Sequence, residues 1–355
     1  MSTTSITSIS RFYFILLVLH LTLSITSVNA SENGLFFVDH FSFTHLGAGG
    51  NNYAMAQNSK GTLFVANRRG LLSFNGSKWQ LIENTTNLLP VSLAIDAQDK
   101  IYLGNNGDFG YLALNSRGKY QFHSLTSKLP KGHQVGIVRE TIIRPDGIYF
   151  RSSQYIYYLN PASELTMIAP QKTSFHRMFA VEDKLLVQEK NHSLTTAYNG
   201  RLTPFSNHSF LADKTLFAVL PFAENMLVLT RKNGLYLFDG AAFTPFAHQA
   251  LEILKHNRIY YARQLSNNRI ALAIEGENSG LLVLNPLGGI VRHITAENGL
   301  ADDLINYIYE DHQKSLWLSL SNGLARINLN APLTYFDQQH QLSGKIYDIT
   351  RAQGT

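Results

Sequence analysis

Apolar and polar residues alternate with a period of two along nearly all of the chain after residue 35. This period is typical of β-strands with one buried face, because successive side chains of a strand point to opposite sides. No stretch in this part carries an apolar stripe of helical period over more than two turns. Polar clusters such as Asn58–Gly61 and Pro145–Gly147 interrupt the alternation, and their residue types favour turns. The pattern therefore predicts an all-β fold of short strands.

One unit of strand and turn recurs along the chain. Residues 297–329 read ENGLADDLINYIYEDHQKSLWLSLSNGLARINL, which is a strand, a polar turn, a strand with an aromatic residue, a Gly-Leu pair and a further strand. Six earlier stretches share this skeleton: 53–76, 92–115, 140–160, 179–200, 218–240 and 262–285. The residues that start the third strand of each unit are spaced by about 40 to 46 residues, which is the length of a propeller blade. They are Gly70, Gly110, Gln154, Ser193, Gly234, Gly280 and Gly323.

We therefore predict a seven-bladed β-propeller of four-stranded blades over residues 47–330. Residues 31–46 are expected to form a lead-in strand, and residues 331–355 the start of an eighth repeat that is cut short. A single blade cannot bury both of its faces, whereas a closed ring of blades can. We expect the large aromatic residues of the second strands to pack between neighbouring blades; they are Phe64, Tyr102, Tyr149 and Trp317. The alternative is a β-sandwich with evenly spaced turns.

The N-terminus has the pattern of a secretory signal. Arg11 precedes an apolar run over residues 12–23, and small and polar residues follow up to Ala30. The run is short for a membrane span, so we predict a signal peptide over residues 1–30 and export of the rest. The alternative is an uncleaved membrane anchor. An exported chain with no cysteine depends on a large core rather than on disulfides.

Composition and charge remove some classes of function. Apolar residues make up 45% of the chain, which is ordinary for a folded protein. The formal net charge is +5, but Lys and Arg are scattered and form no block of five or more. Because nucleic-acid binding requires a basic patch or stripe, we do not expect a nucleic-acid partner.

The sequence offers little sign of catalysis. It contains no cysteine, no Gly-x-Ser-x-Gly and no His-Glu-x-x-His motif. Its 13 histidines are dispersed without the spacing of metal ligands. We therefore expect a protein that is not an enzyme in this region and that uses no cofactor and no metal.

Binding is the more plausible use of a propeller, because the loops on one face surround a central funnel. Alignment of the repeats places six residues at the entry to the first strands, and these are the predicted ligand-binding residues: Tyr53, Arg139, His176, Arg177, Tyr260 and Asn306. Arg and Tyr side chains there can hold a carboxylated or sugar-like ligand by charge-assisted hydrogen bonds and stacking. The alternative is that they serve only the loop backbone or face water.

The seventh unit resembles the repeat of the two-component regulator propeller family. The matching residues include Gly299-Leu300, Asp311, Leu316-Trp317-Leu318 and Gly323-Leu324, whereas Ser319-Leu320 replaces the usual Gly-Thr. Residues 56–82 and 101–112 resemble the first two blades of the same family, and the resemblance extends over almost all of residues 45–355.

The resemblance implies that the chain is the exported sensor part of a bacterial signal-transduction receptor. Such receptors continue into a further β-domain, a membrane helix and an output domain such as a histidine kinase, a DNA-binding domain or a nucleotide cyclase. We expect a periplasmic propeller, tethered through a C-terminal segment absent from this chain, that binds a small molecule or oligosaccharide and can form a homodimer. The alternatives are a stand-alone periplasmic binding propeller and a propeller glycan lyase or hydrolase.

Overall fold

The structure, a computed structural model, describes residues 35–330 and residue 335, except residues 86, 206–208, 212, 232–233 and 247. The chain divides into one unit over Phe36–Ala331 and a second unit made of Met1–Leu35 and Pro332–Thr355. Of the second unit only Leu35 and Tyr335 are described, and they form an isolated antiparallel bridge. The predicted signal peptide, and the predicted eighth repeat apart from Tyr335, lie outside the described residues.

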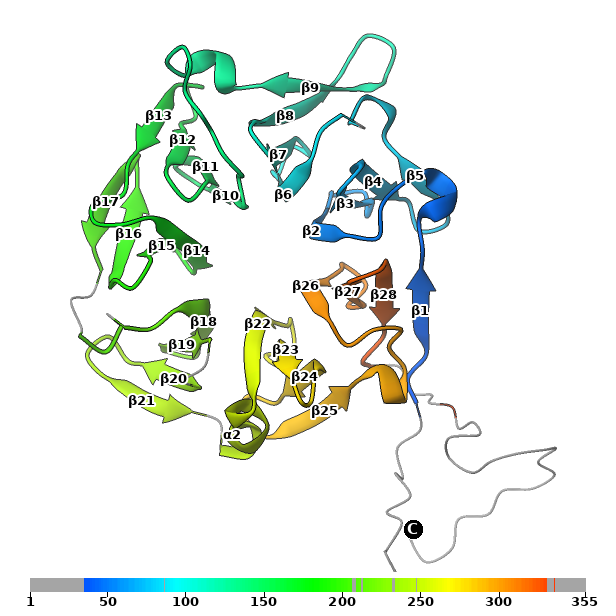
Figure 1. Cartoon of the computed structure of the whole chain (residues 1–355), viewed down its shortest axis with the longest axis vertical. Helices are drawn as coiled ribbons and strands as arrows, with labels where there is room; N and C mark the ends of the chain where they lie inside the picture. The colour runs from blue at the N-terminus through cyan, green and yellow to red at the C-terminus, as the bar shows by residue number, and fades with distance from the viewer. Residues whose placement is uncertain are drawn as a thin grey trace, which may run out of the picture. The chain divides into compact units, whose positions relative to one another are not determined.

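The unit over Phe36–Ala331 contains seven four-stranded antiparallel sheets arranged as blades in a ring (Figure 1), which confirms the predicted β-propeller. Six blades are built from four consecutive strands each. Those of the first three are β2 (Asn52–Gln57), β3 (Leu63–Asn67), β4 (Gly70–Phe74) and β5 (Trp79–Leu81); β6 (Pro90–Ile95), β7 (Ile101–Asn105), β8 (Phe109–Leu114) and β9 (Tyr120–Ser124); β10 (Glu140–Arg144), β11 (Gly147–Arg151), β12 (Ile156–Leu159) and β13 (Leu165–Ile168).

The next three blades repeat this order. Their strands are β14 (Phe175–Val181), β15 (Lys184–Glu189), β16 (Leu194–Tyr198) and β17 (Arg201–Pro204); β18 (Leu216–Phe222), β19 (Asn225–Thr230), β20 (Leu235–Phe238) and β21 (Phe243–Phe246); β22 (Asn257–Gln264), β23 (Ile270–Gly276), β24 (Gly280–Leu284) and β25 (Ile290–Ile294). The first strand of each blade lies nearest the centre of the ring in Figure 1.

The seventh blade takes its strands from both ends of the ring. It consists of β26 (Ile305–Glu310), β27 (Leu316–Leu320), β28 (Leu324–Ile327) and, as its outermost strand, β1 (Val38–Phe41). β1 pairs antiparallel with β28, with Val38 opposite Ile327 and Phe41 opposite Leu324 (Figure 1). The last blade is thus completed by the first strand, and the ring is closed without an unpaired edge on β28.

The remaining elements are short and connect the strands. The α-helix α2 spans His248–Lys255 and leads into β22, and single 3₁₀ turns precede the first strands of several blades. The turns are η1 (Thr44–Leu46), η2 (Glu83–Thr85), η3 (Thr126–Lys128), η4 (Ser209–Leu211) and η5 (Ala296–Asn298).

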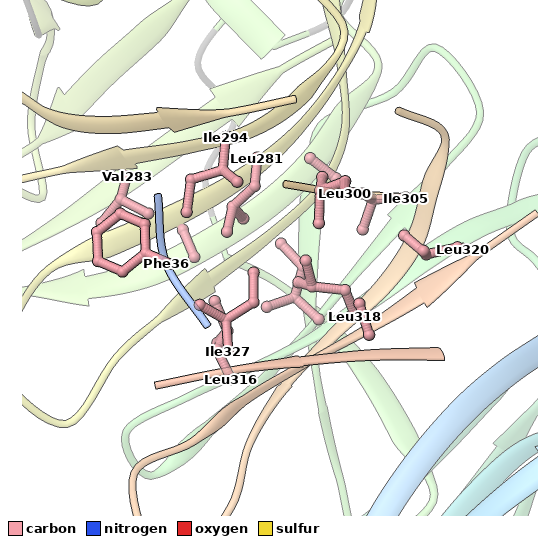
Figure 2. Close-up of a cluster of buried hydrophobic side chains, with 14 of the residues drawn as sticks. Phe36, Leu281, Val283, Ile294, Leu300, Ile305, Leu316, Leu318, Leu320 and Ile327 are labelled. Carbon is pink, nitrogen blue, oxygen red and sulfur yellow. The ribbon is translucent and has the colours of Figure 1, made fainter. Parts of the chain in front are cut away.

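The hydrophobic core lies between the blades. Buried side chains form seven clusters, and each cluster joins residues of two adjacent blades. Figure 2 shows the cluster between the sixth and seventh blades, where Leu281 and Val283 of β24 face Leu316 and Leu318 of β27. The stability of every blade therefore depends on both of its neighbours. This agrees with the alternating sequence pattern, because the apolar face of each strand must be buried against another blade.

The aromatic residues of the second strands occupy these interfaces, as expected from the sequence. Trp317 of β27 is 1% exposed and lies in the cluster that joins the seventh blade to the first. Its ring contacts Phe41 of β1 with centroids 5.4 Å apart, and Trp79 of the first blade with centroids 5.9 Å apart. The indole N–H donates to the buried carboxylate of Asp311 at 2.8 Å, so the one polar atom of the ring is satisfied.

Gly323 permits the closing strand to approach. Its φ is +94°, and a Cβ at this position would lie 2.2 Å from the carbonyl oxygen of Phe41 in β1. Gly76 has the same φ of +94° but no atom within 4 Å of such a Cβ. The two glycines thus share the backbone conformation and differ in their surroundings.

We predict that Gly76→Ala lowers the free energy of unfolding by about 1 kcal/mol, from the positive φ alone. Gly323→Ala is expected to cost an additional 1 to 3 kcal/mol, roughly, because the new methyl group pushes β1 away from β28. Urea denaturation of the two variants measures the difference. Equal losses would show that the close approach of Phe41 does not contribute to stability.

Candidate functional site

A cavity of about 1100 Å³ lies at the centre of the ring and is lined by residues of all seven blades. The first strand of each blade supplies most of the lining. These strands start at one face of the ring and run in the same direction through it, because each blade repeats the same order of strands. One position near the start of each first strand is therefore repeated around the mouth of the cavity.

β-Bulges turn these positions toward the cavity. In six of the seven first strands the pairing with the second strand skips one residue near the strand start. The skipped residues are Tyr53, Val91, His176, Phe217, Tyr260 and Asn306, and all six line the cavity. A bulge interrupts the alternation of side chains, so two consecutive residues of one strand can face the same side. His176 and Arg177 form one such pair, and Tyr260 and Tyr261 another.

The structure brings all six predicted site residues to this cavity. Tyr53, Arg139, His176, Arg177, Tyr260 and Asn306 line it. Arg139 immediately precedes β10, whose pairing with β11 is regular, and its side chain is exposed at the mouth. Their location follows from the structure, whereas binding of a ligand by them stays a prediction.

Sequence reasoning missed other residues of the lining, among them Phe217, Tyr261 and Arg263. Phe217 occupies the position in the fifth blade that His176 and Tyr260 occupy in the fourth and sixth, so a stricter alignment of the repeats would have found it. Arg263 lies two residues beyond Tyr261 on the same strand and hence on the same side. Period-two alternation counted from the bulge would have placed it in the cavity.

Arg177, Phe217 and Tyr260 form a row of neighbouring side chains across three blades. The guanidinium of Arg177 lies 4.5 Å from the ring centroid of Phe217, within the range of a cation–π contact. Its Nη1 donates to the Phe217 carbonyl oxygen at 3.3 Å. The Phe217 ring in turn lies 6.3 Å from the ring of Tyr260, which is 41% exposed. Phe217 thus orients the arginine, and Tyr260 presents an accessible aromatic face at the mouth.

Glu140 and Arg151 form an ion pair in the cavity wall. Arg151 Nε donates to Glu140 Oε2 at 2.7 Å, and the same carboxylate oxygen accepts from the backbone N–H of Met178 at 2.7 Å. The Arg151 side chain is only 4% exposed, so the loss of Glu140 would leave a buried charge unpaired. The pair is bound across the third and fourth blades and fixes the wall beside His176.

The other arginines of the cavity have no such partner. Arg139, Arg177 and Arg263 form no ion pair with any described residue. Glu275 is the further carboxylate of the lining besides Glu140. Since Glu140 is neutralised by Arg151, the cavity carries an excess of positive charge.

His176 lies in the cavity wall and is half-buried. Burial lowers the pKa of its imidazole, and the charges of Arg177 and Arg151 lower it further, against smaller opposing effects of Glu140 and the Leu216 backbone. The ring is therefore neutral at neutral pH. Its Nε2 is buried and has no hydrogen-bond partner among the described residues, and a neutral imidazole nitrogen accepts or donates a hydrogen bond according to the tautomer.

Two tyrosines on the first strands of the sixth and seventh blades form another part of the cavity wall. The rings of Tyr261 and Tyr307 lie 4.6 Å apart, and both residues line the cavity. Burial raises the pKa of Tyr261 well above its usual value, and neighbouring Tyr307 raises it further. The Tyr261 hydroxyl thus stays protonated.

Two further properties concern the described part of the chain. Its His, Cys, Asp and Glu side chains nowhere gather in groups of three that could hold a metal ion. Within the same residues, every helix is too short or too polar to cross a membrane.

Comparison with known proteins gives structural matches alone. No family model matches the chain, and no curated protein matches it by sequence. Among solved structures, the extracellular domains of two hybrid two-component systems of B. thetaiotaomicron are similar to it, each with a TM-score of 0.63 and 18% identity. These matches cover 85% and 84% of this chain, but only 41% and 42% of the sensor domains, so the chain spans about two fifths of their length.

Enzymes share the fold as well. The virginiamycin B lyase of Staphylococcus aureus is similar with a TM-score of 0.59 and 12% identity over 83% of this chain and 99% of the lyase. At these identities the similarity establishes the propeller fold and nothing finer. Sensor and lyase functions are therefore both compatible with the architecture.

The lowered pKa of His176 predicts a pH dependence of stability. The unfolded chain binds a proton at His176 near pH 6.5, roughly the ordinary value, whereas the folded chain resists protonation. Stability from this group is therefore complete above about pH 6.5 and is lost as the pH falls through the folded pKa. We expect His176→Gln to lose less thermal stability than the wild type between about pH 7 and pH 5.

Thermal denaturation across this pH range tests the prediction. His45→Gln, in an exposed turn, is the control and should behave like the wild type. Parallel curves for the wild type and His176→Gln would contradict the assignment of a neutral, buried imidazole.

Proposed function

We propose that the protein is the extracytoplasmic, ligand-sensing propeller of a bacterial signal-transduction receptor, and that the central cavity is its binding site. The observation that carries the proposal is the cavity itself, in which the bulges of six blades collect side chains around one space, and five of these are polar or aromatic. A rigid ring with such a mouth suits recognition of a small molecule or the end of an oligosaccharide.

Two other observations support a receptor. The sequence resembles two-component regulator propellers, and solved structures of similar fold include extracellular domains of two-component systems. On this proposal the propeller is exported, acts outside the cytoplasm, and transmits binding to a further sensor domain and an output domain. A membrane tether, and pairing of two propellers, would belong to the complete receptor.

Signalling then requires a difference in affinity between two states of the receptor. The propeller offers little internal freedom, because each blade is packed against two others. The difference in affinity must arise where the propeller meets another domain or a second copy. The function of this region would thus be binding and not catalysis.

Stabilisation by ligands tests the proposal. We expect one or more members of a panel of carboxylates, phosphates, sugars and short oligosaccharides to raise the melting temperature. Arg177→Ala and Tyr260→Ala should abolish the shift, whereas the control Tyr198→Ala, which changes a tyrosine 65% exposed at the end of β16, should keep it. Shifts that survive both cavity substitutions would place the binding elsewhere and contradict the proposal.

A glycan lyase is the second candidate function. It is favoured by the neutral His176, whose unpartnered Nε2 lies beside arginines, and by the virginiamycin B lyase that shares the fold. Turnover of a polysaccharide by the wild type, lost in His176→Ala, would make this the leading function.

A further inference from the structure

The excess charge of the cavity defines one part of its ligand. The guanidinium of Arg177 is held by the Phe217 ring and carbonyl, which occupy one of its N–H groups. Its other N–H groups have no carboxylate partner among the described residues, although the residue lines the cavity. Arg139 and Arg263 add positive potential to the same space. A ligand that carries a carboxylate gains a charge-assisted hydrogen bond here, which a neutral ligand does not.

His176 indicates a second chemical group of the ligand. Its buried Nε2 has no hydrogen-bond partner among the described residues. An unsatisfied buried polar atom of this kind costs free energy until a partner reaches it, and a hydroxyl can serve either tautomer because it both donates and accepts. Arg177 and His176 are consecutive residues of β14, so the ligand must place a hydroxyl close to its carboxylate. Benzoate has a carboxylate but no hydroxyl, whereas the inorganic phosphate dianion has one O–H but no carbon skeleton.

Tyr260 indicates a third feature of the ligand. Its ring is 41% exposed and lies beyond Phe217 from Arg177, at the mouth of the cavity. An exposed tyrosine at the rim of a polar pocket can stack on the flat, C–H-rich face of a sugar ring. A chain-like hydroxy acid would leave this surface without a contact.

We propose that the cavity binds an acidic sugar of the uronic acid class. The carboxylate lies at Arg177, a ring hydroxyl forms a hydrogen bond with His176 Nε2, and one face of the pyranose stacks on Tyr260. The inference rests on the proposed function and names the ligand class of the same site. The cavity can accept a free uronate or the uronate end of an oligosaccharide, since its mouth is open at Tyr260.

Isothermal titration calorimetry distinguishes this class from its neighbours. The ligands are D-galacturonate, D-glucuronate and their short oligomers, with D-galactose, benzoate and inorganic phosphate as comparisons. We expect a uronate to bind at least tenfold more tightly than galactose, because only the uronate pairs with Arg177. In Arg177→Gln this preference should disappear.

Two variants control the interpretation. Arg201→Gln removes an exposed arginine from β17, the outermost strand of the same blade, and should bind uronate like the wild type. His176→Phe keeps a ring of similar size but removes the polar Nε2, and should weaken uronate binding severalfold without creating a preference for benzoate.

The possible results separate this inference from the proposed function. If galactose binds as tightly as the uronates, or if phosphate or benzoate alone binds, and the binding is lost in Tyr260→Ala, the sensor cavity stands and the uronate class is wrong. If no uronate binds and no other compound of the wider panel depends on Arg177 or Tyr260, both proposals fail. Uronate oligomers that bind and are cleaved would support the ligand class and favour the lyase over the sensor.

Discussion

The pairing of β1 with β28 is the contact on which the whole ring depends. Four residues from the start of the propeller complete the last blade, and Gly323 has no side chain where the Phe41 carbonyl approaches. The core consists of interfaces between blades, so an open ring would expose the faces of its first and last blades. Closure buries Trp317 against Phe41 and Trp79 and holds all seven first strands around one axis.

Closure also produces the site. Each first strand enters from the same face, and in six of the seven a bulge near the strand start points an otherwise alternating side chain toward the centre. The fold alone would give seven equivalent positions. The sequence makes them unequal, with cationic and aromatic groups at His176, Arg177 and Tyr260 and the small apolar Val91 in the second blade. The lining of the cavity is therefore asymmetric on a nearly symmetric scaffold.

The fold could be predicted because its signals are local and repeated. Turn residues and the glycine or polar residue before each third strand mark every blade, and Trp317 was correctly expected between blades. The partner of the lead-in strand was not predicted, since no local pattern links Val38–Phe41 to Leu324–Ile327. The position of the site residues followed from aligning repeats. Their interactions did not, because the orientation of Arg177 by Phe217 and the isolation of His176 Nε2 depend on contacts between blades.

We propose that the cavity holds a ligand through Arg177, His176 and Tyr260, and a crystal structure of the protein soaked with D-galacturonate would show it. We expect electron density for the sugar inside the ring, with its carboxylate on the Arg177 guanidinium and a hydroxyl within hydrogen-bond distance of His176 Nε2. An empty cavity at saturating uronate, or a sugar bound only on the outer strands, would rule this binding mode out.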